Sequence, residues 1–333
     1  MGNLDRRGLL RAGLALAGVS VVSACQIGLP GAGAPAKMRR VGFLTSDPTQ
    51  GPEESAFRQA LGDLGYVEGR NTTFESRATD DDAGLPSAVA ELIERGVDVI
   101  VTGTGPATLA AKTATSSIPI VMAYTDNPVA GGLVASLSRP GGNVTGLSSF
   151  NGLLAPKRVD LLREVLPGLS RVGILWTAAA PSHAVSVSEL EGAARAAGVE
   201  PLGLELIEPA GVEGAFETAS QAGIEALLTT PGPIFGRERF RLAELALQHR
   251  QPLMVNSVRS ATAGALMSYA TDYTDLFRRA ATFVDKIFKG RSPAELPVEQ
   301  PTKFELVINL KTAQALDLQI PPSILAQATQ VLQ

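Results

Sequence analysis

Short aliphatic runs alternate with amphipathic stretches along the chain from residue 40 onward. Short apolar runs are typical of buried strands, whereas apolar residues spaced three and four positions apart predict helices. Gly65 follows one such helical stretch, where it is placed to cap the C-terminus. In this first part the pattern predicts strands at 41–44, 72–75, 97–101 and 118–123, and helices at 53–64, 85–95, 106–115 and 129–138.

The same alternation restarts after residue 150, so the chain carries two series of strand-helix units. Such units predict parallel sheets covered by helices, and a chain of 333 residues has room for two cores. We therefore expect an α/β fold of two Rossmann-like lobes, with parallel sheets, joined by a hinge. The second series predicts strands at 171–176, 200–205, 226–229, 253–256 and 265–268, and helices at 157–166, 186–197, 212–222, 237–249 and 276–289.

The last part of the chain should cross back toward the first lobe, which would make the lobes discontinuous. We expect a signal peptide at 1–24, a flexible tether at 25–38, an N-terminal lobe at 39–149, a C-terminal lobe at 150–272, and a segment at 273–333 that recrosses the hinge and completes the lobes.

Composition narrows the chemistry available to these lobes. Hydrophobic residues make up 45% of the chain and aromatic residues 5%, which is typical of a soluble protein with aliphatic cores. One cysteine and two histidines exclude an intrachain disulfide and a zinc site built from Cys and His. The net charge of -4, without a basic run outside the leader, argues against a nucleic-acid partner. No cofactor is expected, because the Gly141-Gly142 pair lacks the spacing of a phosphate-binding loop.

The N-terminus has the features of an export signal. Arg6 and Arg7 precede an apolar run at 12–22 that is too short to cross a bilayer, as in a twin-arginine leader. Residues 22–25 resemble the lipobox of bacterial lipoproteins, so we expect Cys25 to carry the lipid that anchors the protein to a membrane. The alternative is that Cys25 is a small buried apolar residue. Residues 26–37, rich in Gly, Pro and Ala, would form the tether.

Several longer motifs resemble one protein family. The segment LPVEQPTKFELVINLKTA at 296–313 closely resembles the C-terminal signature of the ABC-transporter substrate-binding family that includes the tryptophan-binding, TrpX-like proteins. The resemblance extends over most of the chain from about Val41 to Leu332. It is carried further by Leu64–Asn71, Val97–Val101, Ser138–Ser148, Leu266–Tyr269, Phe283–Gly290 and Ile320–Pro322.

The resemblance implies a type I periplasmic binding protein fold and a substrate-binding lipoprotein of an ABC importer. Such a protein is exported, acts as a monomer, captures a small molecule and delivers it to the transporter permease; the first expectation for the ligand is an amino acid or a similar metabolite. Family members commonly carry glycine pairs around the segment 267–269, where this chain has Gly264-Ala265 before it and Ala270-Thr271 after it. The family's ligands therefore do not carry over directly.

Polar and small residues follow the predicted strands of the first lobe. Carboxyl ends of parallel strands meet helix N-termini there, and small anionic or zwitterionic ligands bind at such edges. The turn Gly103-Thr104-Gly105-Pro106, called here the glycine-rich turn, is the strongest candidate, although Thr104 is also typical of a helix N-cap. Asp126 could either hold an ammonium or cap a helix. The candidates for ligand binding are Thr45, Ser46, Gly103, Thr104, Gly105, Pro106, Ala107, Tyr124, Thr125 and Asp126.

The second lobe offers an equivalent set. Trp176 could stack on a ligand or fill the core, and Arg259 could bind a carboxylate or lie isolated at the surface. Phe150 lies beside the expected crossing. The candidates here are Asn151, Trp176, Thr177, Thr230, Pro231, Asn256, Ser257 and Tyr269.

Three other functions compete with binding and delivery as interpretations of the sequence. A ligand-sensing partner of a membrane receptor would use the same fold, so the sequence does not separate it from a transport protein. A hydrolase is disfavoured, because His183 and His249 have no nucleophile elbow beside them. A transcriptional regulator is disfavoured, because an export leader stands where a helix-turn-helix would precede the first lobe. We expect no catalytic activity.

Overall fold

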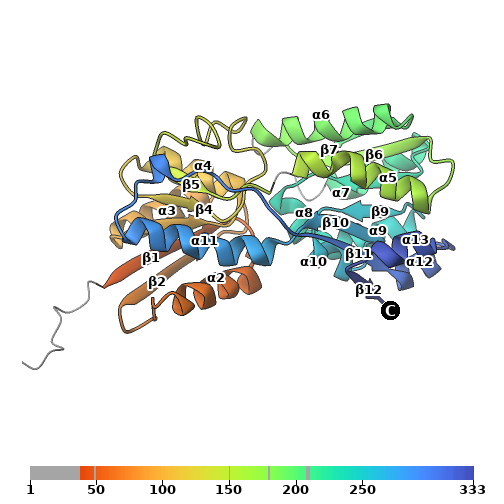
Figure 1. Cartoon of the computed structure of the whole chain (residues 1–333). Helices are drawn as coiled ribbons and strands as arrows, with labels where there is room; N and C mark the ends of the chain where they lie inside the picture. Colours follow the sequence, from red (N-terminus) through yellow and green to blue (C-terminus); the bar gives the residue numbers. More distant parts are fainter. Residues whose placement is uncertain (1–37, 49, 150, 179–180, 208–210) are drawn as a thin grey trace, which may run out of the picture. The chain divides into compact units, whose positions relative to one another are not determined.

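The structure is a computed structural model, and it describes residues 38–48, 50–149, 151–178, 181–207 and 211–333 (Figure 1). The expected leader, Cys25, the tether up to residue 37 and Phe150 lie outside the described residues, as do the side chains of Asn151 and His183. In the part that is described, no helix is both long enough and apolar enough to span a bilayer.

The first sheet has five parallel strands in the order β2-β1-β3-β4-β5. Its central register places Val41 opposite both Phe74 and Val99. Alternate residues of each strand point to opposite faces, so Phe43 packs with α2, whereas Leu44 packs with α3 and α4. The elements are β1 (Arg39–Thr45), α2 (Gly51–Asp63), β2 (Thr72–Ala78), α3 (Leu85–Glu94), β3 (Val99–Thr102), α4 (Gly105–Ala114), β4 (Ile120–Met122) and β5 (Val144–Gly146).

One helix predicted for the first lobe is absent. Residues 129–138 form turns, and the short strand β5, which the pattern did not predict, follows them. The N–H of Gly131 donates to the carbonyl oxygen of Asn127 at 2.8 Å, as at the start of a helix, but Gly132 then adopts a φ of +65°. A left-handed glycine ends a helix, so this segment stops after one turn.

The second sheet has seven strands in the order β12-β11-β10-β9-β8-β6-β7. Its strands β6 to β10 run parallel, as expected, whereas β11, toward the edge, is antiparallel to β10. The strands are β6 (Arg171–Trp176), β7 (Glu200–Glu205), β8 (Ala226–Thr229), β9 (Leu253–Val255), β10 (Met267–Thr271), β11 (Phe304–Asn309) and β12 (Gln330–Leu332).

Two apolar clusters cover the two faces of this sheet. Ile174 and Leu228 pack in one cluster with α5, whereas Leu175 and Leu227 pack in the other with α7 and α9. The helical elements are η1 (Asn151–Leu154), α5 (Ala155–Val165), α6 (Pro181–Ala196), α7 (Val212–Gln221), α8 (Pro233–Arg237), α9 (Arg239–Gln248), α10 (Val258–Thr262), α12 (Leu310–Ala315) and α13 (Pro322–Gln327).

Helix α11 (Tyr273–Phe288) leaves the second sheet and covers the first, beside α2 (Figure 1). Asp272 caps its N-terminus by accepting from the N–H of Asp275 at 2.9 Å. Phe277 and Phe283 are fully buried against the first sheet, with the rings of Phe43 and Phe277 6.1 Å apart. The chain then passes through η3 (Pro293–Glu295) and returns to the second sheet as β11. The predicted α/β fold of two lobes is confirmed.

Candidate functional site

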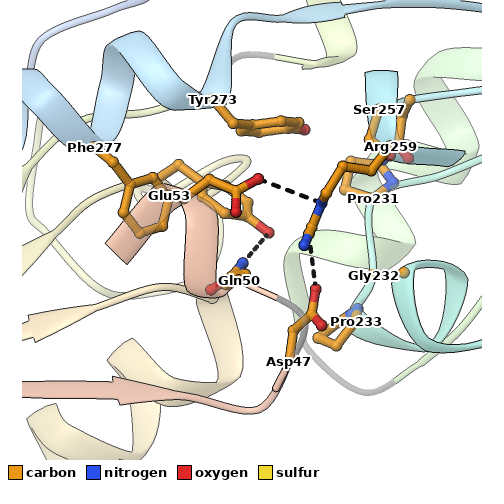
Figure 2. Close-up of a pocket in the computed structure, with 13 residues that line it drawn as sticks. Asp47, Gln50, Glu53, Pro231, Gly232, Pro233, Ser257, Arg259, Tyr273 and Phe277 are labelled. Carbon is orange, nitrogen blue, oxygen red and sulfur yellow. Dashed lines mark hydrogen bonds and ion pairs between the residues drawn. The ribbon is translucent and has the colours of Figure 1, made fainter. Parts of the chain in front are cut away.

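One pocket brings together loops that follow strands of both sheets (Figure 2). The first sheet contributes the segment after β1 and Tyr124, which lies just beyond β4. The second sheet contributes the segments after β8 and β9, and α11 adds two residues from its N-terminal part. The pocket contains about 460 Å³ of empty space, part of it open to solvent. It is lined by Asp47, Gln50, Glu53, Tyr124, Pro231, Gly232, Pro233, Gly236, Asn256, Ser257, Arg259, Tyr273 and Phe277.

An arginine from the second lobe pairs with two carboxylates of the first. Nη2 of Arg259 lies 3.1 Å from Oδ2 of Asp47, and Nε lies 3.3 Å from Oε1 of Glu53 (Figure 2). The side chains of Asp47 and Glu53 are only 5% and 9% exposed, whereas that of Arg259 is 30% exposed. Because buried charges are retained when they are paired, these contacts hold the two walls of the pocket together.

Gln50 connects the pocket to the glycine-rich turn behind it. Its Nε2 donates to the carbonyl oxygen of Gly103 at 2.8 Å and to the hydroxyl of Tyr124 at 3.4 Å. Its Oε1 accepts from Oγ1 of Thr45 at 2.8 Å. A Cβ at Gly103 would lie 2.2 Å from that same Oε1, so a glycine at this position allows Gln50 to approach the turn. The turn therefore positions a residue that lines the pocket.

Aromatic rings form another part of the pocket wall. The ring centroids of Tyr124 and Tyr273 are 4.6 Å apart, and those of Tyr124 and Phe277 are 6.2 Å apart. Burial, and then the neighbouring Tyr273, raises the pKa of Tyr124 well above its usual value, so its phenol is neutral at physiological pH. A flat apolar ligand would find ring faces and edges on this side.

Burial raises the pKa of the Glu53 carboxyl above its usual value, although Arg259 acts in the opposite direction. The unfolded chain then loses this proton at a lower pH than the folded chain, so the contribution of Glu53 to stability falls as pH rises from 4.5 through the folded pKa. The groups that face it are Arg259 on α10, Asp47 after β1, Tyr124 after β4, and Tyr273 and Phe277 on α11.

We therefore predict that Glu53→Gln removes a loss of stability that the wild type undergoes as pH rises. The free energy of unfolding of the wild type, relative to that of the variant, should decrease between pH 4 and pH 7 as the buried carboxylate ionises. Urea unfolding followed by circular dichroism at several pH values measures this difference. A difference that stays constant or increases over this range would contradict the assignment.

Four of the residues predicted from the sequence line this pocket: Tyr124, Pro231, Asn256 and Ser257. Ser257 also caps α10, since its side chain accepts from the N–H of Ser260 at 3.2 Å. Arg259, named as a possible carboxylate binder, also lines the pocket, where it pairs with carboxylates of this chain. The role of all five in binding a ligand stays a prediction.

The glycine-rich turn and the end of β1 lie outside the pocket lining. Thr104 caps α4, because its Oγ1 accepts from the N–H of Ala107 at 3.3 Å, and it also lies 3.2 Å from Oγ of Ser46. The carbonyl oxygen of Ser46 accepts from Nη1 of Arg237 at 2.7 Å, which is a further contact between the lobes. The predicted residues in this group are Thr45, Ser46, Gly103, Thr104, Gly105, Pro106 and Ala107.

Asp126 lies in a different cluster, also between the lobes. Oγ of Ser186, on α6, donates to Oδ2 of Asp126, and Oγ of Ser149 lies 3.4 Å from Oδ1. Asp126 borders a smaller pocket with Glu189, whose pKa is raised by burial and then by Asp126. Thr125 is buried beside it. Asp126 therefore belongs to a polar contact between the lobes.

The remaining predicted residues lie in the second lobe, outside the pocket lining. Nε of the fully buried Arg158 donates to the carbonyl oxygen of Tyr269 at 2.8 Å. Thr230 is fully buried and donates to the carbonyl oxygen of Leu175 at 3.3 Å. Trp176 is half-buried, Thr177 is buried, and neither lies in the pocket lining. Asn151 belongs to η1.

Sequence reasoning missed several lining residues. Asp47 directly follows the predicted Thr45-Ser46 pair, so its position was within reach. Acidic residues are common in the first turn of a helix, so nothing in the sequence indicated that Glu53 lines a pocket. Tyr273 and Phe277 could be placed only once α11 was seen to cover the first sheet. Among the described residues, no cluster of His, Cys, Asp and Glu could hold a metal ion.

Comparison with known proteins gives a consistent result. The family described as ABC transporter substrate binding protein matches residues 41–332. A tyrosine-binding protein from Clostridioides difficile (strain R20291) is 26% identical over 287 residues, which cover 85% of this chain and 82% of the relative.

Two solved structures share the fold. A domain from Streptococcus pneumonia in complex with L-Trp has a TM-score of 0.84 and 24% identity, and the match covers 89% of this chain and all of that chain. A conserved domain protein from Vibrio cholerae has a TM-score of 0.83 and 26% identity over the same shares. These matches place the two lobes in the fold of solute-binding proteins.

Proposed function

Because the chain belongs to the family of ABC transporter substrate binding proteins, we propose that its pocket captures a small solute and that the protein delivers it to the permease of an ABC importer. The observation that carries this proposal is the pocket itself, which is lined by loops from both lobes. A ligand that contacts both walls stabilises the closed arrangement, and closure then couples occupancy to recognition by a transporter.

We propose an aromatic amino acid as the first class of ligand. Tyr124, Tyr273 and Phe277 provide rings for an aromatic side chain, and the paired charges of the pocket suit a zwitterion. The similar protein from C. difficile is described as tyrosine-binding, and the similar structure from S. pneumonia holds L-Trp. The family match and the similar structure that holds L-Trp support a role in binding and not in catalysis.

We also propose that the protein is exported and anchored by a lipid on Cys25 as a monomer. The support is the order of features in the sequence, namely the arginine pair, the short apolar run and the cysteine that follows small residues. A tether of about a dozen residues would then leave the lobes free to meet a permease at the membrane.

Isothermal titration against the twenty amino acids tests the proposed ligand class. We expect at least one aromatic amino acid to bind, and Tyr273→Ala to weaken that binding at least about tenfold, since a ring contact that is covered by ligand contributes roughly 1.5–3 kcal/mol. Phe240→Ala is the matched control, because Phe240 is 62% exposed on α9 and outside the pocket lining. A flat titration across the amino acids and a wider panel of sugars and nucleosides would contradict the proposal.

A further inference from the structure

One carboxylate oxygen in the pocket is buried and unused. The side chain of Glu53 is more than nine-tenths buried, and its Oε1 faces Nε of Arg259. Its other oxygen, Oε2, has no hydrogen-bond partner among the residues that the structure describes. Buried carboxylate oxygens nearly always have a donor, and an unpaired one is costly. Glu53 therefore retains acceptor capacity within a pocket that a ligand can enter.

Arg259 is the cation that now pairs with the two carboxylates of the pocket. Its guanidinium extends from the second lobe to a point between Asp47 and Glu53 (Figure 2). Two carboxylates face one guanidinium, so the charged side chains among the described lining residues sum to one negative charge. Arg259 is also the most exposed of the three, on a long side chain that can swing toward solvent.

Aromatic groups lie next to this charge cluster. Tyr273 projects over the space between Glu53 and Arg259, and Phe277 lies beside Glu53, on the side away from Arg259 (Figure 2). A cation held by carboxylates beside ring faces gains a further attraction from the rings. The same rings can pack against the flat body of a ligand.

From these three features we propose that the pocket selects a protonated amine carried on an aromatic body, and that this amine takes the place of the Arg259 guanidinium against Glu53. This inference rests on the proposed function, because it assumes that the pocket holds a solute. Arg259 is then an internal competitor for the cation site. When the ligand carries a carboxylate as well, the displaced guanidinium is a partner for it.

Three compounds that share a phenol but differ in their charged groups test which group of the ligand the pocket recognises. Tyramine has only the amine, 3-(4-hydroxyphenyl)propionate has only the carboxylate, and tyrosine has both. In titrations of the purified protein we expect tyramine and tyrosine to bind, and the propionate to bind at least about 30-fold more weakly, because it brings a second anion to the carboxylates and no donor for Oε2 of Glu53. Binding of the propionate as tightly as tyramine overturns the inference and leaves solute binding intact.

Two substitutions then test the competition. Glu53→Gln should weaken tyramine binding roughly 30-fold, because it removes the anionic partner. Arg259→Gln should lower the tyramine Kd, because it removes the guanidinium that competes with the amine for Glu53. An ordinary ligand contact would give the opposite sign, so a tyramine Kd that rises threefold or more in Arg259→Gln overturns the proposal.

Two controls of matched charge lie on helices that contribute to the pocket: one on α2, which carries Glu53, and one on α11. Asp63→Asn removes an exposed carboxylate at the end of α2, and Arg278→Gln removes an exposed guanidinium on α11. Neither should change the tyramine Kd. If wild-type protein binds neither tyramine nor the propionate, the amine proposal falls, while solute binding is decided separately by the amino-acid, sugar and nucleoside panel.

Discussion

Replacing Gly146 with alanine is expected to lower the free energy of unfolding by about 3 kcal/mol or more. Gly146 has a φ of +130°, which side chains rarely adopt. It lies opposite Met122 in the β4–β5 pair, and a Cβ would lie 2.1 Å from the carbonyl oxygen of Met122. That oxygen also accepts from the N–H of Leu147 at 2.9 Å, so relieving the clash disrupts the end of the strand pair.

Urea unfolding followed by circular dichroism measures this effect. The matched control is Gly142→Ala, because a Cβ at Gly142 would meet no atom within 4 Å and the backbone has no positive φ there. The control should change stability by less than about 0.5 kcal/mol. A loss below about 1 kcal/mol in Gly146→Ala would show that β5 tolerates a side chain at this position.

The second large effect is expected for Arg158→Met, with a loss of about 3–5 kcal/mol. Arg158 is 1% exposed, and its Nε donates to the carbonyl oxygen of Tyr269 at 2.8 Å. Burial lowers the pKa of Arg158, while Tyr273 and then Asp126 act in the opposite direction. Methionine fills much of the volume but leaves a buried carbonyl without this donor and a buried carboxylate without a nearby cation.

A double variant shows how much of this loss is electrostatic. Arg158→Met combined with Asp126→Asn removes both charges, so we expect the pair to be at least about 1 kcal/mol more stable than the sum of the single losses predicts. Arg163→Met, at an exposed position of the same helix α5, should be nearly neutral. A loss close to zero in Arg158→Met would mean that this buried guanidinium contributes nothing to stability.

The strands of the second lobe could be predicted to the residue in several places. The strands at 171–176, 200–205 and 226–229 have the bounds that the pattern gave. The strands at 171–176 and 226–229 contain continuous buried runs, and the strand at 200–205 holds its apolar residues between two exposed glutamates, so burial gives the limits of each. The helix predicted at 129–138 is wrong. The apolar spacing of this segment is typical of a helix, but Gly132 adopts a left-handed conformation that ends the helix after one turn.

The pocket could be predicted only in part. Tyr124, Asn256 and Ser257 follow strands, and the rule that ligands bind at carboxyl ends of parallel strands was sufficient to select them. The rule also selected Thr104, although the hydroxyl of Thr104 caps its own helix. Local sequence does not show that Arg259 and Glu53 meet, because they lie on different lobes and pair only through the tertiary arrangement.

The position of α11 in the chain determines when the first lobe can finish folding. The first sheet is complete by residue 146, but α11, which covers one of its faces together with α2, ends at Phe288, and more than a hundred intervening residues belong largely to the other sheet. Val41, Val99 and Val121 therefore stay partly open to water or to transient partners during synthesis until α11 emerges. A chain cut before residue 273 would expose this apolar surface permanently, so aggregation is the expected fate of such a fragment.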